Sequence, residues 1–395
     1  MGPEELFLVV VALLPVAAAS GWYFGRREAM HGHLERAGGS TMSPDYFRGL
    51  NYLLHDRPDK AIEVFLKVLE VEADTVETHL ALGSLFRRRG EVDRAIRIHQ
   101  NLVARPTLEA SQRALALLEL GLDYMRSGLF DRAESLFAEL LDIGMYEQQA
   151  LRHLVDIYQQ EQDWDKAIEF SRRLEAATGE NLNSVRAHFL CEKAQAELDQ
   201  NPRADVQELL DQALSTDRKC VRASLMIADL SFAKGDYERT IQALKKIEHQ
   251  DLDFLPEVVP RLIKAFRAAE RVDDLCDYLE SLAALRAGIS PVLALAELTA
   301  ERAGEEEAKR YIINELKIRP TIRGIDRLID YALTNAGGEA REDLLLLKET
   351  ALRLIAGKAS YKCGNCGFAG RAMHWQCPSC KSWNTVKPIH GIEGE

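Results

Sequence analysis

The chain has no excess of positive charge and few cysteines outside its C-terminal end. Its 395 residues contain 50 Lys and Arg against 62 Asp and Glu, a formal net charge of −12. Because an acidic surface repels a phosphate backbone, non-specific binding to nucleic acid is disfavoured. Only Cys191, Cys220 and Cys276 precede residue 363, and we expect all three to be small apolar residues of the interior. Four further cysteines crowd near the C-terminus, which favours a metal site over a disulfide framework.

The sequence also lacks the motifs of common catalytic sites. It contains no Ser–His–Asp constellation, no phosphate-binding glycine loop and no paired-carboxylate motif. The composition, 47% hydrophobic and 28% charged, is that of a folded globular chain. We therefore expect a binding protein that is not an enzyme.

One long uncharged run is present, close to the N-terminus. Leu6–Phe24 comprises nineteen residues without a charge, and a transmembrane helix needs about 20. Glu4–Glu5 precede the run and Arg26–Arg27 follow it. Because positive flanks stay in the cytoplasm, the N-terminus is predicted outside and the rest of the chain inside.

A cleaved signal peptide is the alternative for this run, since Ala17–Ala19 offers small residues. A signal peptide carries its positive charge before the apolar run, and here the charge follows it. We expect an uncleaved anchor over residues 1–25 and a juxtamembrane linker over residues 26–42.

A pattern of small and aromatic residues recurs through the middle of the chain. Gly49 and Gly83 are 34 positions apart, as are Ala61 and Ala95. This period is that of the tetratricopeptide repeat, a pair of antiparallel helices. We predict an all-α superhelical solenoid over residues 43–356 with about eight or nine helical pairs. The pattern blurs after residue 180, where a generic antiparallel helical array is the alternative.

Such an array presents a concave surface, lined by the first helix of each pair, that holds peptides or partner domains. A solvated or packing role is the alternative for every candidate position, and cations such as Arg87 and Arg88 are also favoured at a helix C-terminus. The candidate groove positions are Tyr46, Leu50, Leu53, Arg87, Arg88, Met125, Arg126, Arg152, Asp156 and Gln159.

The C-terminal cysteines form two Cys-x-x-Cys pairs, Cys363 with Cys366 and Cys377 with Cys380, separated by ten residues. Two such knuckles complete a tetrahedral four-thiolate site, which is closed and therefore structural. Zinc and a single iron ion both suit this ligand set. We predict a rubredoxin-like ribbon over residues 357–390 and a short tail over residues 391–395.

The ribbon is too small to fold on an apolar core alone, so metal binding and folding should be coupled. Trp375 and Trp383 are expected either to form its core or to dock it on the repeats. His374 is expected to be a loop or packing residue, because four thiols already saturate the metal.

The order of these parts resembles the lipopolysaccharide assembly protein B family. The resemblance includes the Leu6–Phe24 anchor, the Gly49 and Ala61 type repeats, and the four ribbon cysteines. It implies a single-pass inner-membrane protein of Gram-negative bacteria whose repeats face the cytoplasm. It also implies an adaptor that helps the membrane protease FtsH degrade the deacetylase committing carbon to lipid A. Lipopolysaccharide export and sensing proteins are further implied partners, and the ribbon is expected to pack on the repeats.

Two other functions remain open on the sequence. The ribbon could hold iron and transfer electrons, with the repeats docking a reductase. Nucleic-acid binding by the ribbon ranks last, since the positive charge of Lys362, Arg371, Lys381 and Lys387 is offset in part by the thiolate site.

Overall fold

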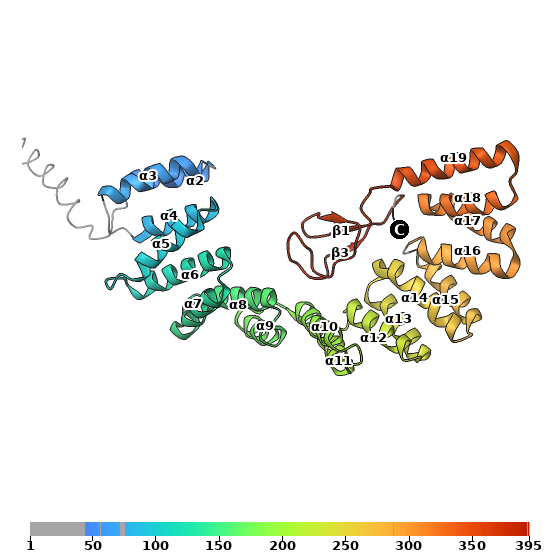
Figure 1. Cartoon of the computed structure of the whole chain (residues 1–395), viewed down its shortest axis with the longest axis horizontal. Helices are drawn as coiled ribbons and strands as arrows, with labels where there is room; N and C mark the ends of the chain where they lie inside the picture. Colours follow the sequence, from blue (N-terminus) through green and yellow to red (C-terminus); the bar gives the residue numbers. More distant parts are fainter. Residues whose placement is uncertain (1–43, 56, 72–75, 287, 393, 395) are drawn as a thin grey trace, which may run out of the picture. The chain divides into compact units, whose positions relative to one another are not determined.

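The computed structural model describes residues 44–55, 57–71, 76–286, 288–392 and 394. In this part of the chain, a long series of α-helices precedes a small antiparallel sheet (Figure 1). The helices are α2 (Pro44–Leu54), α3 (Pro58–Val71), α4 (Val76–Arg88), α5 (Val92–Val103), α6 (Ala110–Ser127), α7 (Phe130–Ile143), α8 (Glu147–Glu161), α9 (Trp164–Thr178), α10 (Asn183–Gln200), α11 (Gln207–Thr216), α12 (Val221–Ala233), α13 (Tyr237–Gln250), the 3₁₀ turn η1 (Leu252–Phe254), α14 (Leu255–Ala268), α15 (Val272–Ala284), α16 (Ser290–Ala303), α17 (Glu305–Ile318), α18 (Ile322–Asn335) and α19 (Gly338–Ile355).

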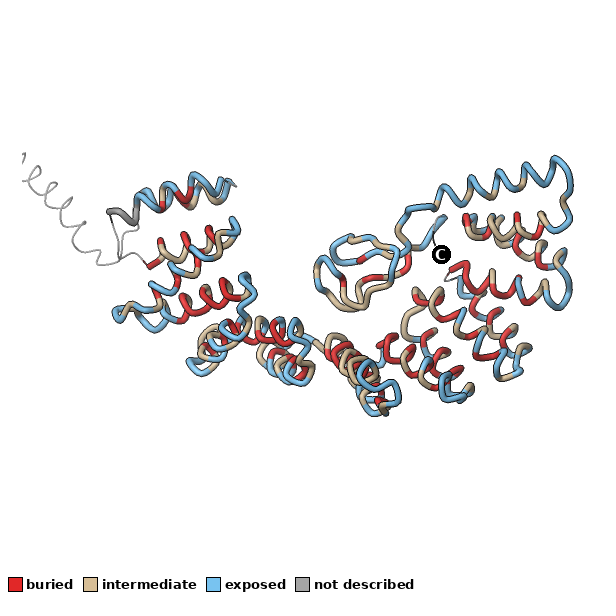
Figure 2. The backbone as a smooth tube through the Cα atoms, in the orientation of Figure 1, coloured by how far each residue is buried: buried red, intermediate tan, exposed pale blue. Residues whose placement is uncertain are grey.

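Consecutive helices form pairs, from α2 with α3 to α18 with α19, which makes nine pairs within the described residues. Each pair also contacts a neighbouring pair, as expected of a solenoid. Buried residues lie on the sides of the helices that face one another, whereas α19 is exposed along most of its length (Figure 2). The predicted all-helical repeat architecture with a C-terminal ribbon is confirmed.

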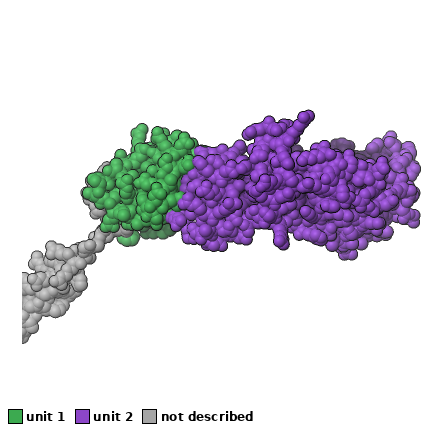
Figure 3. All heavy atoms as spheres, turned by 90° about the horizontal axis from the view of Figure 1, so that it is seen from below, with its two compact units in different colours: residues 1–146 green, residues 147–395 purple. Residues whose placement is uncertain are grey.

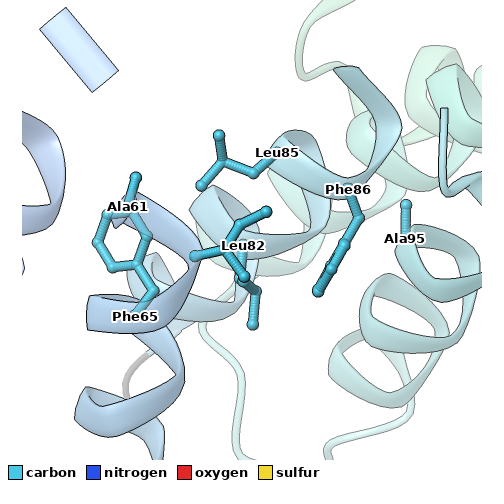
Figure 4. Packing of buried hydrophobic residues seen from close by; sticks show 7 residues of the cluster. Ala61, Phe65, Leu82, Leu85, Phe86 and Ala95 are labelled. Carbon is cyan, nitrogen blue, oxygen red and sulfur yellow. The ribbon is translucent and has the colours of Figure 1, made fainter. Parts of the chain in front are cut away.

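Close approach within a pair depends on a missing side chain in the first helix. A Cβ atom at Gly49 would lie 2.6 Å from the Phe65 ring, and one at Gly121 would lie 2.6 Å from the Phe137 ring. Ala61, Phe65, Phe86 and Ala95 belong to one buried cluster, seen in Figure 4. The recurring glycines and alanines are therefore packing positions, as the 34-residue pattern predicts.

The turns between helices use the expected residue types. Gly128 ends α6 in the left-handed conformation, with φ of 77°, and its N–H donates to Met125 O. Gly235 also has a positive φ, and Asp236 after it accepts a hydrogen bond from Arg239 N at the start of α13. At Gly235, a glycine without a Cβ penalty and the capping carboxylate that follows it separate α12 from α13.

The chain divides into two compact units, one ending at Tyr146 and the other beginning at Glu147 (Figure 3). The ribbon belongs to the second unit. The predicted anchor Leu6–Phe24 and the linker after it lie outside the described residues. Among the helices that are described, none is both long and apolar enough to cross a membrane.

Candidate metal centre and its contacts with the repeats

The sulfur atoms of the four C-terminal cysteines lie close together. Their sulfur atoms all lie within 4.8 Å of one another. Cys363 Sγ is 3.8 Å from Cys380 Sγ, and Cys366 Sγ is 3.6 Å from Cys377 Sγ. A tetrahedral ion with metal–sulfur bonds of about 2.3 Å needs sulfur atoms about 3.8 Å apart. The arrangement thus fits one four-thiolate metal ion.

A small sheet and two knuckles hold the sulfurs in place. Strand β1 (Tyr361–Cys363) pairs antiparallel with β2 (Ala369–Gly370) and β3 (Val386–Pro388). In the first knuckle, Asn365 N donates to Cys363 Sγ at 3.4 Å, and Gly367 has a φ of 77°. In the second knuckle the left-handed position is Lys381, with φ of 59°. Backbone N–H groups that point at the sulfurs stabilise thiolates.

Hydrogen bonds and burial act on the thiols in opposite directions. A hydrogen bond from the Ser382 side chain lowers the pKa of Cys380 to about 6. Burial raises the pKa of Cys377 to about 11, because a dry site disfavours a bare thiolate. A divalent cation resolves this conflict, since it holds all four sulfurs deprotonated. The set has no open position for water or substrate, as is typical of a structural site.

Two tryptophans dock the ribbon on the repeats of its own unit. Trp383 stacks on His188 of α10, with ring centroids 5.2 Å apart, and its Nε1 donates to Gln159 Oε1 of α8 at 2.8 Å. Trp375 stacks on Phe254 of η1 with centroids 5.4 Å apart. Of the two expected roles for these tryptophans, the structure shows docking.

His188 packs as a neutral aromatic ring between the two tryptophans. Its centroid lies 5.8 Å from that of Trp375, and its side chain is almost fully buried. Burial, helped by the positive charge of Arg222, lowers the pKa of His188 to about 3. The ring is therefore uncharged at neutral pH, which suits stacking in an apolar contact.

Charged groups complete the docking contact at its other edge. Lys387 of β3 lies 2.8 Å from Asp251, the N-cap of η1, and 3.0 Å from Asp253 within η1. His390 Nε2 lies 3.2 Å from Asp253 Oδ1. Because these acids belong to the array and Lys387 to the ribbon, the net positive ribbon meets a negative surface.

The predicted groove positions on α8 lie beside this contact. Gln159 binds Trp383, and Arg152 pairs with Glu180 at 2.8 Å. The Asp156 side chain is 52% exposed, yet desolvation by the surrounding protein raises its pKa to about 6, with Arg152 acting in the opposite direction. The ribbon of the same chain therefore occupies one of the positions expected to bind a partner.

Arg87 belongs to a network between neighbouring pairs in the first unit. It lies 2.6 Å from Glu119 and 2.8 Å from Asp123 of α6. Asp123 is fully buried, and its other oxygen is 2.5 Å from Nδ1 of the buried His99. The Arg87 side chain thus pairs with acids of the neighbouring helical pair.

Of the other predicted groove positions, some pack against the core and some are exposed to solvent. Leu50 and Leu53 pack against the buried cluster around Phe65. Met125 is half-buried, whereas Arg88 and Arg126 are exposed. The Tyr46 side chain lies outside the described part of the structure.

Sequence reasoning missed the array side of the docking contact. His188, Phe254, Asp251 and Asp253 were not among the expected site residues, and each is far from the ribbon in sequence. In the sequence, only the repeat period pointed to the helices on which these residues lie. A 34-residue period predicts repeats but not which of their side chains a distant domain will touch.

The comparisons with known proteins agree with this geometry. The rubredoxin metal binding domain matches residues 361–388, and tetratricopeptide repeat models match residues 78–111, 118–181 and 191–251. The chain is thus a tetratricopeptide-repeat protein that carries a rubredoxin-type metal-binding domain. Over 392 residues it is 38% identical to lipopolysaccharide assembly protein B of Escherichia coli K12, with 99% of both chains covered.

The protein of the same name from Haemophilus influenzae is 34% identical over 399 residues, again with 99% of both chains covered. The chain belongs to the lipopolysaccharide assembly protein B family. Among solved structures, the C-terminal part of a repeat protein from Cytophaga hutchinsonii matches at 17% identity with a TM-score of 0.41, covering 62% of this chain and 94% of that one.

Proposed function

We propose that this protein is an inner-membrane adaptor for lipopolysaccharide assembly that presents the lipid A deacetylase to the protease FtsH. Family membership and the names of its relatives support a role in lipopolysaccharide assembly. A solenoid of helical pairs supports binding instead of catalysis, because it offers extended surfaces for other proteins. In this proposal Leu6–Phe24 anchors the chain beside a membrane protease, with the repeats in the cytoplasm.

The observation that carries the proposal is the docking of the metal ribbon on the repeats. Trp375 and Trp383 fix the ribbon against α8, α10 and η1 within the second unit. The ribbon and the neighbouring repeat surface therefore form one composite surface. A saturated metal site has no open position for water or substrate, so in this proposal its contribution is to hold that surface in shape.

Deacetylase turnover in cells tests the adaptor function. We expect the half-life of the deacetylase to lengthen when the chromosomal gene encodes Trp375→Ala and Trp383→Ala, which undock the ribbon. A variant lacking residues 1–25 should have the same effect, since it leaves the array intact but unanchored. Lys362→Gln, at an exposed position of β1, is the control. Normal turnover in both test variants, with normal protein levels, would contradict the proposal.

An electron-transfer role is the second candidate, favoured by the exposure of Cys366 at the metal site. Electron transfer needs iron and a reversible redox couple, whereas the adaptor needs only a bound ion. Metal analysis of untagged, freshly purified protein separates the two. A red, iron-loaded protein with a reversible couple would favour electron transfer, and a colourless zinc protein would exclude it.

A further inference from the structure

Helix α19, the last helix of the array, carries a large exposed apolar surface. None of its residues is buried (Figure 2), and five of its leucines are between 41% and 63% exposed. These leucines are Leu345, Leu346, Leu347, Leu352 and Leu354. The terminal repeat of a solenoid needs a polar outer face to stay soluble. A cluster of leucines in this place therefore indicates a surface that another protein covers.

One side of α19 packs on α18 as in the inner helical pairs. The half-buried positions of α19 recur at a spacing of four, three and four residues, and they are Leu344, Lys348, Ala351 and Ile355. Lys348 Nζ pairs with Asp330 of α18, so this stripe faces α18. The five exposed leucines lie outside the stripe, on the rest of the helix surface.

The register of the inner pairs shows what covers two of these positions elsewhere in the array. In α3, α9 and α13, the residue after the first member of the equivalent stripe is also buried, at Ile62, Ile168 and Ile241. Each of these helices is followed by a further helix that packs on it. Leu345 has the equivalent place in α19, and Leu352 lies two turns later on the same face. Because the ribbon follows α19 instead of another pair, this face is left open to a helix from elsewhere.

The charges beside these two leucines favour a second copy of α19. Glu342 and Arg353 lie on the same flank of the face, at its two ends. If two α19 helices pack antiparallel about a two-fold axis, Leu345 of each copy meets Leu352 of the other. Glu342 of each copy then lies beside Arg353 of the other, whereas a parallel pair brings like charges together. Arg353 now pairs with Glu349 at 2.6 Å, but both side chains are more than half exposed, so this pair contributes little and can be exchanged.

We propose that this face of α19 is a dimer interface, in which α19 of a second copy packs antiparallel across Leu345 and Leu352. A two-fold interface is self-complementary, so each leucine and each charge is used twice. Two helices of 18 residues form a small interface compared with the about 1,200–2,000 Å² of stable complexes. The dimer should therefore dissociate on dilution. This proposal does not depend on the adaptor function.

The mass of the full-length, metal-loaded protein in detergent, measured over a range of concentrations with the micelle subtracted, tests the proposal. We expect a monomer–dimer equilibrium. Leu345→Gln with Leu352→Gln should raise the dissociation constant by about tenfold or more, because four leucines of each dimer lose their burial. Leu347→Gln with Leu354→Gln is the matched control, since it changes two exposed leucines at the same spacing on the other side of α19.

Circular dichroism checks that both variants keep their helices. A wild-type protein that stays monomeric would show that the exposed face of α19 serves a different partner, and it would overturn the proposal. An unchanged dissociation constant in the test variant, or an equal rise in the control variant, would also overturn it.

Cysteine crosslinking with a short bis-maleimide tests the orientation, in a Cys276→Ser background that removes the half-buried thiol of α15. Glu349→Cys lies near the two-fold axis and should be captured as a homodimer. Glu342→Cys should not, because the antiparallel copies of this position are about 20 Å apart along the helix, but it should react with Arg353→Cys when the two proteins are mixed. The background protein without an added cysteine is the control for reaction at the ribbon. No capture of Glu349→Cys, or equal self-capture of Glu342→Cys, would overturn the antiparallel dimer.

Discussion

At the residue scale, the packing of the pairs α2–α3, α4–α5 and α6–α7 depends on which ring fills the space above a glycine. Phe65 lies over Gly49 and Phe137 lies over Gly121, and His99 takes the same position over Gly83. The histidine differs because its Nδ1 meets the buried Asp123 of the next pair. The sequence pattern predicts the glycine. It does not show that one ring is polar and tied to a neighbouring repeat.

The first prediction concerns Gly121. An alanine there would place Cβ 2.6 Å from the Phe137 ring, so the ring or the helix must move. Overpacking of this kind costs about 1–3 kcal/mol of the free energy of unfolding. Urea unfolding of Gly121→Ala measures the loss. Gly337→Ala is the control, since a Cβ at Gly337 meets no atom within 4 Å. Equal stability of the two variants would show that the close approach does not matter.

The second prediction concerns the pH dependence contributed by Asp156. Its pKa in the folded protein is about 6, above the usual value of about 3.9 for an unfolded chain. The folded state therefore binds the extra proton, and this group lowers stability as pH rises from about 4 to about 6. Asp156→Asn removes the charge, so the variant should be the more stable protein at neutral pH.

Because the Asp156 side chain is 52% exposed, solvent screens the effect, and we expect a gain below about 1 kcal/mol. Urea unfolding at about pH 5 and at about pH 7.5 measures it, and the gain should be larger at the higher pH. Asp211→Asn, at an exposed site of α11, is the control. A gain that is the same at both pH values would refute the explanation.

At the element scale, the ribbon and the array were predictable as separate parts, but their contact was not. Cysteine spacing is a local signal, and two knuckles define one metal site wherever the domain lies. The contact of Trp383 with Gln159 joins residues 224 positions apart. Such a pair depends on how successive helical pairs are rotated, which is a property of many packed side chains and not of any one motif.

The third prediction tests this contact. Replacing Trp375 and Trp383 with alanine removes the stacking on Phe254 and His188. Both tryptophans are half-buried, so each truncation should cost less than the loss of about 3–5 kcal/mol that is typical of a fully buried aromatic side chain. We expect the ribbon to detach while keeping its metal, because the four cysteines are unchanged. Proteolysis of the linker over residues 356–360 should accelerate at unchanged zinc content. Linker cleavage at the rate of the Lys362→Gln control would mean that the tryptophans do not hold the ribbon.

At the scale of the whole molecule, charge is distributed unevenly between the parts. Residues 357–392 contain no Asp or Glu, although the full chain has a net charge of −12. Lys387 accordingly meets Asp251 and Asp253 of the array. Two kinds of contact therefore join the ribbon to the array: the aromatic stacks and this ion-pair cluster. Each can be altered without changing a metal ligand.

The last prediction separates the metal from the contacts that depend on it. Replacing Cys377 and Cys380 with serine leaves too few thiolates for a tetrahedral site, and structural zinc typically contributes about 10–16 kcal/mol to such small domains. Residues 361–388 should then unfold, because a segment of this size has too little core to fold alone. The helical pairs should remain folded, since each is stabilised by its neighbours and not by the ribbon. Cys276→Ser, on α15 outside the ribbon, is the control.

Circular dichroism, zinc content and hydrogen exchange measure the three expected results in one preparation. The helical signal should persist, the zinc should be lost, and exchange should rise both in the ribbon and at the array residues it covers, Phe254 and His188. The undocked tryptophan variant should show the same rise at the array but keep its zinc. If the cysteine variant kept protection at Phe254 and His188, the ribbon would dock without its metal. Coupling between metal binding and docking would then be disproved.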